Sequence, residues 1–171
     1  MTTHSLGSGW TITPELFRWI RTHLPEGKVI LELGSGYGTQ ELLKCYNVFS
    51  VEHDPAWLAC APGNHVIHAP IRDCDGYRWY DTDILRKELP QQYDLLLIDG
   101  PPKSIGRSGF LHHLDLFELH VPIIVDDCNR PEELAMLHAL AATLNRRFEI
   151  IETTQVHKTQ GRKAFGVLHV T

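Results

Sequence analysis

The chain has 171 residues, which is the size of one globular domain. Hydrophobic residues make up 43% and charged residues 22%, and this excludes a disordered, collagenous or coiled-coil protein. Sixteen lysines and arginines against 21 acidic residues give a net charge of -5, so no overall positive field attracts phosphate backbones or anionic lipid. We therefore expect no nucleic-acid partner.

The cysteines and apolar runs indicate the compartment. The four cysteines include no C-x-x-C pair, which excludes a zinc ribbon and a redox dithiol and suits a reducing cytosol. No run approaches the ~20 apolar residues of a membrane span, and the first residues lack the basic start and apolar stretch of a signal peptide. We expect a soluble, cytoplasmic protein without a membrane span.

No internal repeat, low-complexity tract or linker divides the chain, because glycines and prolines fall singly or in short turn clusters. We therefore expect one domain over residues 1–171. An N-terminal segment and helix occupy residues 1–27, and residues 28–171 form the core.

Strands and helices are predicted to alternate along the chain. The first helix follows Thr13, which can cap it, and Pro14, which suits its first turn. Another helical pattern follows Pro131. Between the helices, short apolar runs rich in β-branched residues and leucine are predicted to be strands covered on both faces. These runs are 29–33, 48–52, 65–69, 95–99 and 123–127.

The end of the chain has a different pattern. Residues 147–156 and 163–170 are predicted as two adjacent strands, joined by a polar, glycine-containing loop that exposes Arg162 and Lys163. Together with the alternation before it, this predicts a doubly wound α/β fold whose parallel sheet ends in an antiparallel hairpin. In such a fold, ligands bind at the carboxyl ends of the strands.

The most informative segment follows the first predicted strand. Glu32 precedes glycines at 34, 36 and 38, where the chain can turn tightly and a ligand can lie against bare backbone. Glu52 closes the second strand, where a carboxylate can accept two hydrogen bonds from a ribose diol. Together they predict a nucleoside site. The third glycine comes one residue earlier than in the dinucleotide pattern G-x-G-x-x-G, which disfavours NAD.

Glu32 and the three alternate glycines resemble the first motif of class I S-adenosylmethionine-dependent methyltransferases, and the resemblance covers nearly the whole chain. It implies a Rossmann-like, three-layer α/β/α fold with seven strands in the order 3-2-1-4-5-7-6, the last antiparallel. It also implies S-adenosylmethionine as cofactor, with the glycine loop beneath its methionine part, Glu52 on its ribose and Ala69 beside its adenine. The residues assigned to the cofactor are Glu32, Gly34, Ser35, Gly36, Gly38, Glu52, His53, Ala69 and Asp99.

Three carboxylates follow the fourth and fifth strands and should converge beside the cofactor loop. They belong to Asp99, Asp126 and Asp127, and a divalent cation such as Mg²⁺ would relieve their mutual repulsion. The arrangement resembles the metal-dependent O-methyltransferases of the catechol type, which implies a metal site at these three residues. Lys103 lies four residues beyond Asp99, whereas the catalytic lysine of that family comes three beyond.

A more local resemblance links the I-D-G-P-P and D-D-C-N-R-P segments to the glucuronoxylan O-methyltransferase family, which acts on a sugar hydroxyl. Arg107, Asn129 and Arg130 match by position and are the predicted substrate-binding residues. Arg107 can clamp an acidic group such as a uronate or a phosphate. The match departs at Asp126, where that family has a histidine.

These resemblances predict O-methylation of a hydroxyl on a sugar, a polysaccharide or a small molecule. An in-line attack on a sulfonium methyl requires the protein to align the two reactants and to remove one proton. A metal at the three aspartates would lower the pKa of the hydroxyl, or a side chain would take the proton. The predicted catalytic residues are Asp99, Lys103, His112 and His113.

Three alternatives stay open. An N-methyltransferase acting on an amine or a base has an aromatic residue after its D/N-P-P motif, whereas this chain has D-G-P-P-K. An NAD(P)-dependent oxidoreductase or epimerase shares the sheet, but its Tyr-x-x-x-Lys pair is missing. A non-catalytic cofactor-binding module has little use for the aspartates. The expected partner is a small-molecule or glycan acceptor, and a homodimer is the commonest assembly if the chain associates.

Overall fold

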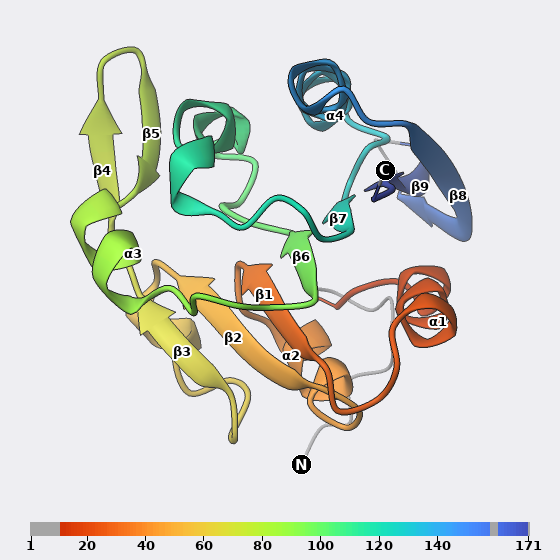
Figure 1. The fold of residues 1–171 in the computed structure, drawn as a ribbon, viewed down its shortest axis with the longest axis horizontal. Helices are drawn as coiled ribbons and strands as arrows, with labels where there is room; N and C mark the ends of the chain where they lie inside the picture. The colour runs from red at the N-terminus through yellow and green to blue at the C-terminus, as the bar shows by residue number, and fades with distance from the viewer. Residues whose placement is uncertain (1–10, 158–160, 171) are drawn as a thin grey trace.

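The computed structural model describes residues 11–157 and 161–170, and a seven-stranded sheet forms its centre (Figure 1). The strand order is β3-β2-β1-β6-β7-β9-β8. The strands are β1 (Val29–Leu33), β2 (Asn47–Glu52), β3 (His65–His68), β6 (Leu95–Ile98), β7 (Ile123–Val125), β8 (Phe148–His157) and β9 (Gly161–Leu168). The first five pair in parallel, and β9 runs antiparallel to both of its neighbours. Counted without the separate hairpin β4–β5, this confirms the predicted order 3-2-1-4-5-7-6.

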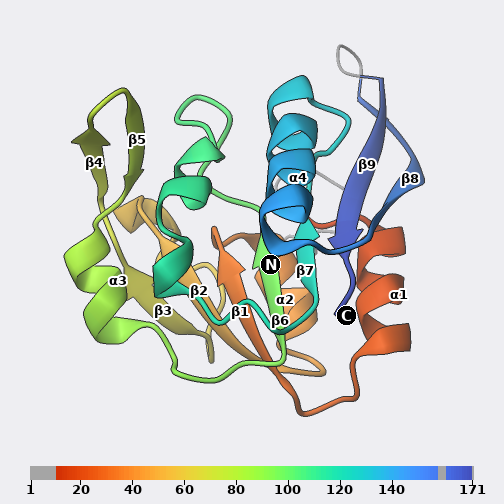
Figure 2. The same ribbon diagram turned by 45° about the horizontal axis from the view of Figure 1, so that its top comes forward.

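Helices cover both faces of this sheet, so the predicted three layers are confirmed (Figure 2). They are α1 (Pro14–His23), α2 (Tyr37–Leu42), α3 (Thr82–Glu88) and α4 (Pro131–Leu144), with 3-10 turns η1 (Pro55–Trp57), η2 (Ser108–His112) and η3 (Leu114–Leu116). One apolar core lies under α1 and α2, and the other lies under α3 and α4. Strand β6 serves both, because Leu96 and Ile98 point to the α4 side while Leu95 and Leu97 point to the α1 side.

The helix ends follow the predicted capping signals. Thr13 caps α1 by accepting a hydrogen bond from the Leu16 N–H at 3.2 Å, and Pro14 is its first residue. Helix α4 begins at Pro131 and ends before Asn145, which adopts the left-handed conformation at φ 50°. Within residues 11–157 and 161–170, no helix is long and apolar enough to cross a membrane.

The hairpin of β4 (Ile71–Cys74) and β5 (Tyr77–Tyr80) is an element that the sequence analysis did not predict. Its turn carries a Gly76 with φ 83°, as an Asp-Gly hairpin turn requires. Trp79 is fully buried at the base of the hairpin against Gly109 of η2, where a Cβ would lie 2.6 Å from the indole ring. The hairpin therefore rests on the segment between β6 and β7.

The C-terminal hairpin differs from the prediction at its turn. β9 begins at Gly161 and not at the predicted residue 163, so Arg162 also belongs to the strand, because pairing between β8 and β9 continues as far as His157 opposite Gly161. Arg162 is exposed, as expected, but Lys163 is half-buried. This extension of β9 brings Lys163 to the carboxyl end of the parallel strands, where it lines the main cavity.

Candidate functional site

Two of the three loop glycines are required by close backbone contacts. Gly34 has φ 94°, and a Cβ there would lie 3.1 Å from the backbone nitrogen of Gly100 in the loop after β6. A Cβ on Gly38 would lie 2.9 Å from the backbone nitrogen of Ile12. Because neither glycine carries a Cβ, the turn after β1 can pack closely against these two segments. The glycine loop is thus packed between the segment before α1 and the loop after β6.

Glu32 stabilises this loop from behind. Its Oε2 accepts hydrogen bonds from the hydroxyls of Thr39 (2.7 Å) and Ser50 (2.6 Å), and the Thr39 Oγ1 in turn accepts one from the Gly36 N–H. Burial raises the pKa of Glu32 to about 7, while the bonds from Ser50 and Thr39 act in the opposite direction. The residue lies under the glycine loop and is 2% exposed, so its hydrogen bonds act on the shape of that loop.

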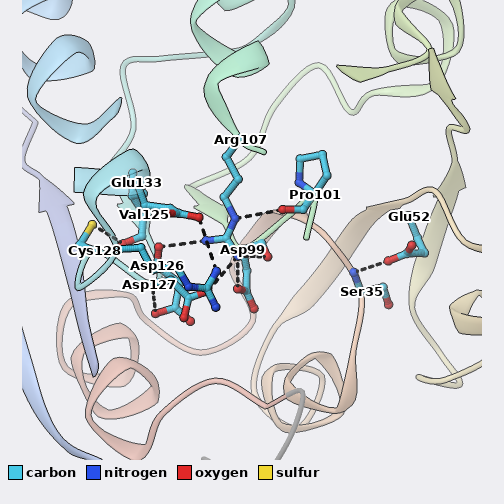
Figure 3. Close-up of polar contacts among 11 residues, drawn as sticks. Ser35, Glu52, Asp99, Pro101, Arg107, Val125, Asp126, Asp127, Cys128 and Glu133 are labelled. Carbon is cyan, nitrogen blue, oxygen red and sulfur yellow. Dashed lines mark hydrogen bonds and ion pairs between the residues drawn. The ribbon is translucent and has the colours of Figure 1, made fainter. Parts of the chain in front are cut away.

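Glu52 is held at the end of β2 by three backbone amides. Its Oε2 accepts a hydrogen bond from the Ser35 N–H at 2.9 Å (Figure 3). Its Oε1 accepts bonds from the N–H groups of His53 and Asp54 at 2.7 Å. The Nδ1 of His53 also lies 2.8 Å from Oε1. These bonds fix the carboxylate beside the glycine loop.

A cavity of about 620 Å³ opens over the carboxyl ends of the strands, where the fold class predicts a ligand. Among the predicted cofactor residues, Gly34, Ser35, Gly36, Glu52, His53 and Asp99 line it. Glu32, Gly38 and Ala69 lie behind its wall; Ala69 is fully buried and donates its N–H to the Glu52 carbonyl oxygen. The further lining residues are Thr11, Asp54, Trp57, Gly100, Pro102, Lys103, Ser104, Arg107, Asp126, Asp127, Arg130 and Lys163.

The three predicted aspartates do come together at the other end of this cavity, around Arg107 (Figure 3). Nη2 of Arg107 lies 3.1 Å from Asp99 Oδ1 and 3.0 Å from Asp127 Oδ2. Its Nε donates to the Pro101 carbonyl oxygen at 3.2 Å, and its Nη1 donates to the Asp126 carbonyl oxygen at 2.9 Å. Burial acts to lower the pKa of Arg107, but the surrounding carboxylates outweigh it and raise this pKa.

A second arginine adds to the cluster. Nη1 of Arg130 lies 2.9 Å from Asp127 Oδ2 and 3.4 Å from Glu133 Oε1. Burial and the neighbouring Asp126 raise the pKa of Asp99 well above its usual range, although Arg107 opposes them. Burial and Asp127 likewise raise the pKa of Asp126 to about 6. The cluster is thus a buried network of opposite charges in which some carboxyl groups hold protons more tightly than usual.

The other predicted residues are divided between the cavity and its surroundings. Lys103 and Arg130 line the cavity. His112 and His113 instead lie against the β4–β5 hairpin, where His112 stacks on Tyr77 with ring centroids 4.2 Å apart and the His113 Nε2 lies 2.9 Å from the Tyr77 hydroxyl. Burial lowers the pKa of His113.

Asn129 has a structural contact: its Oδ1 accepts a hydrogen bond from the Ala164 N–H at 3.4 Å and joins the loop after β7 to β9. Two lining residues, Trp57 and Lys163, were not among the predicted site residues. An aromatic residue shortly after the acid that ends β2 was a usable signal for Trp57. Lys163 had no such signal, because its position depends on where β9 begins.

Comparisons with known proteins find solved structures that share this fold. No protein-family model matches the sequence, and no curated protein matches it significantly. Solved structures do match: the O-methyltransferase from Bacillus cereus in complex with SAH has a TM-score of 0.62 at 17% identity, covering 94% of this chain and 82% of that one. The O-methyltransferase TomG from Streptomyces achromogenes, in complex with SAM, has a TM-score of 0.58 at 19% identity, covering 92% and 78%.

An rRNA methylase from Streptococcus thermophilus also matches, with a TM-score of 0.58 at 11% identity over 91% of this chain and 94% of that one. The neighbours are S-adenosylmethionine-dependent methyltransferases, several of them O-methyltransferases, so the chain has the Rossmann-like fold of that class. Because these neighbours include both O-methyltransferases and an rRNA methylase, the fold leaves the acceptor open.

Proposed function

We propose that the protein is an S-adenosylmethionine-dependent methyltransferase that acts on a hydroxyl group. The observation that carries the proposal is the pairing of two features in one cavity. At one end of the cavity, Glu52 is fixed by backbone amides beside the glycine loop. At the other end, Asp99, a member of the aspartate cluster, lines the cavity. Structural neighbours with bound SAM or SAH support the choice of cofactor.

The cofactor supplies an electrophilic methyl group when it is bound. Glu52 would accept a hydrogen bond from the ribose at Oε2, because the Ser35 N–H uses one lone pair of that oxygen, whereas Oε1 already contacts the N–H groups of His53 and Asp54 and the Nδ1 of His53. The backbone from Gly34 to Gly36 would lie beneath the methionine part. Ala69 supports this end of the site through its bond to the Glu52 carbonyl oxygen.

On the acceptor side, Asp99 is the best placed proton acceptor. Its side chain is 31% exposed, whereas that of Asp127 is 8% exposed, so Asp99 is the more accessible to a substrate in the cavity. Its Oδ1 accepts a hydrogen bond from Arg107 Nη2, so Oδ2 is the atom that would take the proton of the hydroxyl. Lys103 lines the same cavity and is the second predicted catalytic residue there, while the positions of His112 and His113 favour a role in supporting the hairpin.

A hydroxyl of a sugar, a polysaccharide or a small molecule suits this arrangement better than an amine or a base. The loop after β6 reads D-G-P-P-K and offers no aromatic side chain to stack on a planar amine. The cavity is lined by Lys103 and Lys163 together with acidic residues, and its two arginines are ion-paired with aspartates. The two lysines are therefore the groups that would contact a carboxylate or phosphate on an acceptor. A divalent cation on the aspartates would need donor oxygens that Arg107 and Arg130 already contact.

Calorimetry with S-adenosylmethionine and with NADH tests the cofactor. We expect micromolar binding of S-adenosylmethionine and at least about tenfold weaker binding by Glu52→Gln, because the variant loses the charge that orients the ribose hydroxyls. Glu26→Gln is the matched control, since the Glu26 side chain is 62% exposed and contacts only Arg21 among the ion pairs of the described residues. Binding of NADH alone would refute the methyltransferase proposal and favour the oxidoreductase alternative.

The acceptor is tested with cofactor carrying a labelled methyl group. Hydroxyl acceptors such as uronic-acid oligosaccharides, sugar phosphates and small diols are compared with primary amines, and mass spectrometry locates the methyl group. Labelled ethers support the proposal, whereas labelled amines would replace it with N-methylation. Cofactor binding without transfer to any acceptor would favour a non-catalytic binding module.

A further inference from the structure

The acidic cluster at the ends of β6 and β7 has the composition of a divalent-cation site. One carboxylate oxygen from each of Asp99, Asp126 and Asp127 lies within 4.8 Å of the others. Carboxylate oxygens are the ligands that Mg²⁺ and similar hard cations take. Whether the cluster can accept an ion depends on what these oxygens already contact.

Arg107 occupies the centre of the cluster. Its Nη2 lies 3.1 Å from Asp99 Oδ1 and 3.0 Å from Asp127 Oδ2, so one nitrogen lies between two of the three carboxylates. Its Nε and Nη1 donate to the carbonyl oxygens of Pro101 and Asp126. All three guanidinium nitrogens therefore have acceptors, and the side chain is 4% exposed.

A divalent ion does not fit beside this guanidinium. Mg²⁺ requires oxygens at about 2.1 Å in a near-octahedral arrangement, whereas Asp99 Oδ1 and Asp127 Oδ2 are already hydrogen-bonded to Arg107 Nη2, which holds a positive charge among the three carboxylates. The guanidinium keeps its positive charge at every accessible pH, so it would repel the ion. It cannot turn away without breaking its bonds to the Pro101 and Asp126 carbonyl oxygens.

We propose that Arg107 is the resident cation of this cluster and that the site works without a metal ion. Arg107 is then a positioning residue, because its side chain ties the loop after β6 to the loop after β7 and fixes Asp99 and Asp127 in place. Arg130 adds a second positive charge on Asp127. One consequence rests on the proposed function: chelators should not affect methyl transfer.

Titration of the 171-residue chain with Mn²⁺ alone, followed by electron paramagnetic resonance and calorimetry, tests the occupancy of the cluster. We expect no site tighter than on the order of 1 mM. A stoichiometric Mn²⁺ site that is lost in Asp127→Asn but kept in Asp83→Asn would overturn the proposal. Asp83 is a matched control, because its side chain is 95% exposed.

Removing the guanidinium gives the complementary test. In Arg107→Gln the carboxylates lose their central charge, so we expect Mn²⁺ binding to strengthen at least about tenfold, while Arg86→Gln at an exposed ion pair changes nothing. A merely structural arginine would not create a metal site when removed. A folded Arg107→Gln with unchanged Mn²⁺ affinity would overturn the proposal. If this variant does not fold, the wild-type titration still decides, and Arg107→Lys provides a charged comparison that should remain free of Mn²⁺.

Failure of this inference is distinguishable from failure of the proposed function. If S-adenosylmethionine binds but methyl transfer is abolished by EDTA and restored by Mn²⁺, the assignment of Arg107 is wrong and the methyltransferase proposal stands. If neither S-adenosylmethionine nor Mn²⁺ binds, the methyltransferase proposal is wrong while the assignment of Arg107 stands.

Discussion

Replacing Glu32 by glutamine should remove a pH-dependent loss of stability. The carboxyl group is 2% exposed, and burial raises its pKa from 4.5 to about 7. The folded chain therefore keeps this proton to higher pH than the unfolded chain does. Between about pH 4.5 and 7 the unfolded state binds fewer protons, so the free energy of unfolding falls as the pH rises. The contribution is fully present below pH 4.5 and is lost above about pH 7.

The difference between these two pKa values corresponds to about 3 kcal/mol. Glutamine keeps the shape and the acceptor oxygen that the hydroxyls of Thr39 and Ser50 use, but it does not ionise. Between about pH 4 and about pH 8, we therefore expect the free energy of unfolding of Glu32→Gln to rise by about 3 kcal/mol relative to wild type.

Urea unfolding followed by tryptophan fluorescence, without cofactor and at several pH values, measures this difference. Glu26→Gln is the control, because its exposed side chain should give a difference that does not vary with pH. A difference between Glu32→Gln and wild type that stays flat over the range would refute burial of the carboxylate as the dominant influence on Glu32.

Three further outcomes are expected. Thr13→Ala should lower the free energy of unfolding by about 1 kcal/mol, because the bond from the Leu16 N–H is lost, and chemical denaturation measures it. Gly109→Ala should destabilise the chain by about 1–3 kcal/mol and change the fluorescence of Trp79, because the new Cβ meets the indole ring; unchanged fluorescence and stability would contradict this packing. Asp99→Asn should lower the rate of methyl transfer at least about hundredfold in a labelled-methyl assay while S-adenosylmethionine still binds, and a rate near wild type would remove Asp99 as the base.

The sheet was predictable because its information is local. Each parallel strand is an apolar run bounded by turn residues, and two glycines of the first loop line the cavity at the carboxyl ends of the strands. Order and direction then follow from the resemblance and from the handedness of crossovers. The missed hairpin β4–β5 had a weaker signal, because its strands have four residues each and β4 carries two adjacent charged residues, Arg72 and Asp73. Its Asp75-Gly76 turn was the usable sign.

The candidate site was predictable as a set of carboxylates but not as a network. Asp99, Asp126 and Asp127 follow strand ends, and their convergence is a consequence of parallel pairing. The partner of these carboxylates was not readable, since Arg107 lies in a loop and meets Asp127 twenty residues away. An arginine can act either as a clamp for a substrate anion or as an internal cation. Only the burial of the guanidinium distinguishes these two roles for Arg107.

The segment between β6 and η2 is held from several sides at once. Arg107 bonds its own loop at Pro101, the Arg78 guanidinium donates to the Ser104 carbonyl oxygen, and Trp79 packs against Gly109. A wall fixed at so many points resists opening and closing over a substrate. Selection of the acceptor should then follow from fit to a rigid template, and turnover should not wait for a loop to reopen before product leaves. Temperature-jump or relaxation-dispersion measurements on this segment should accordingly find no slow exchange.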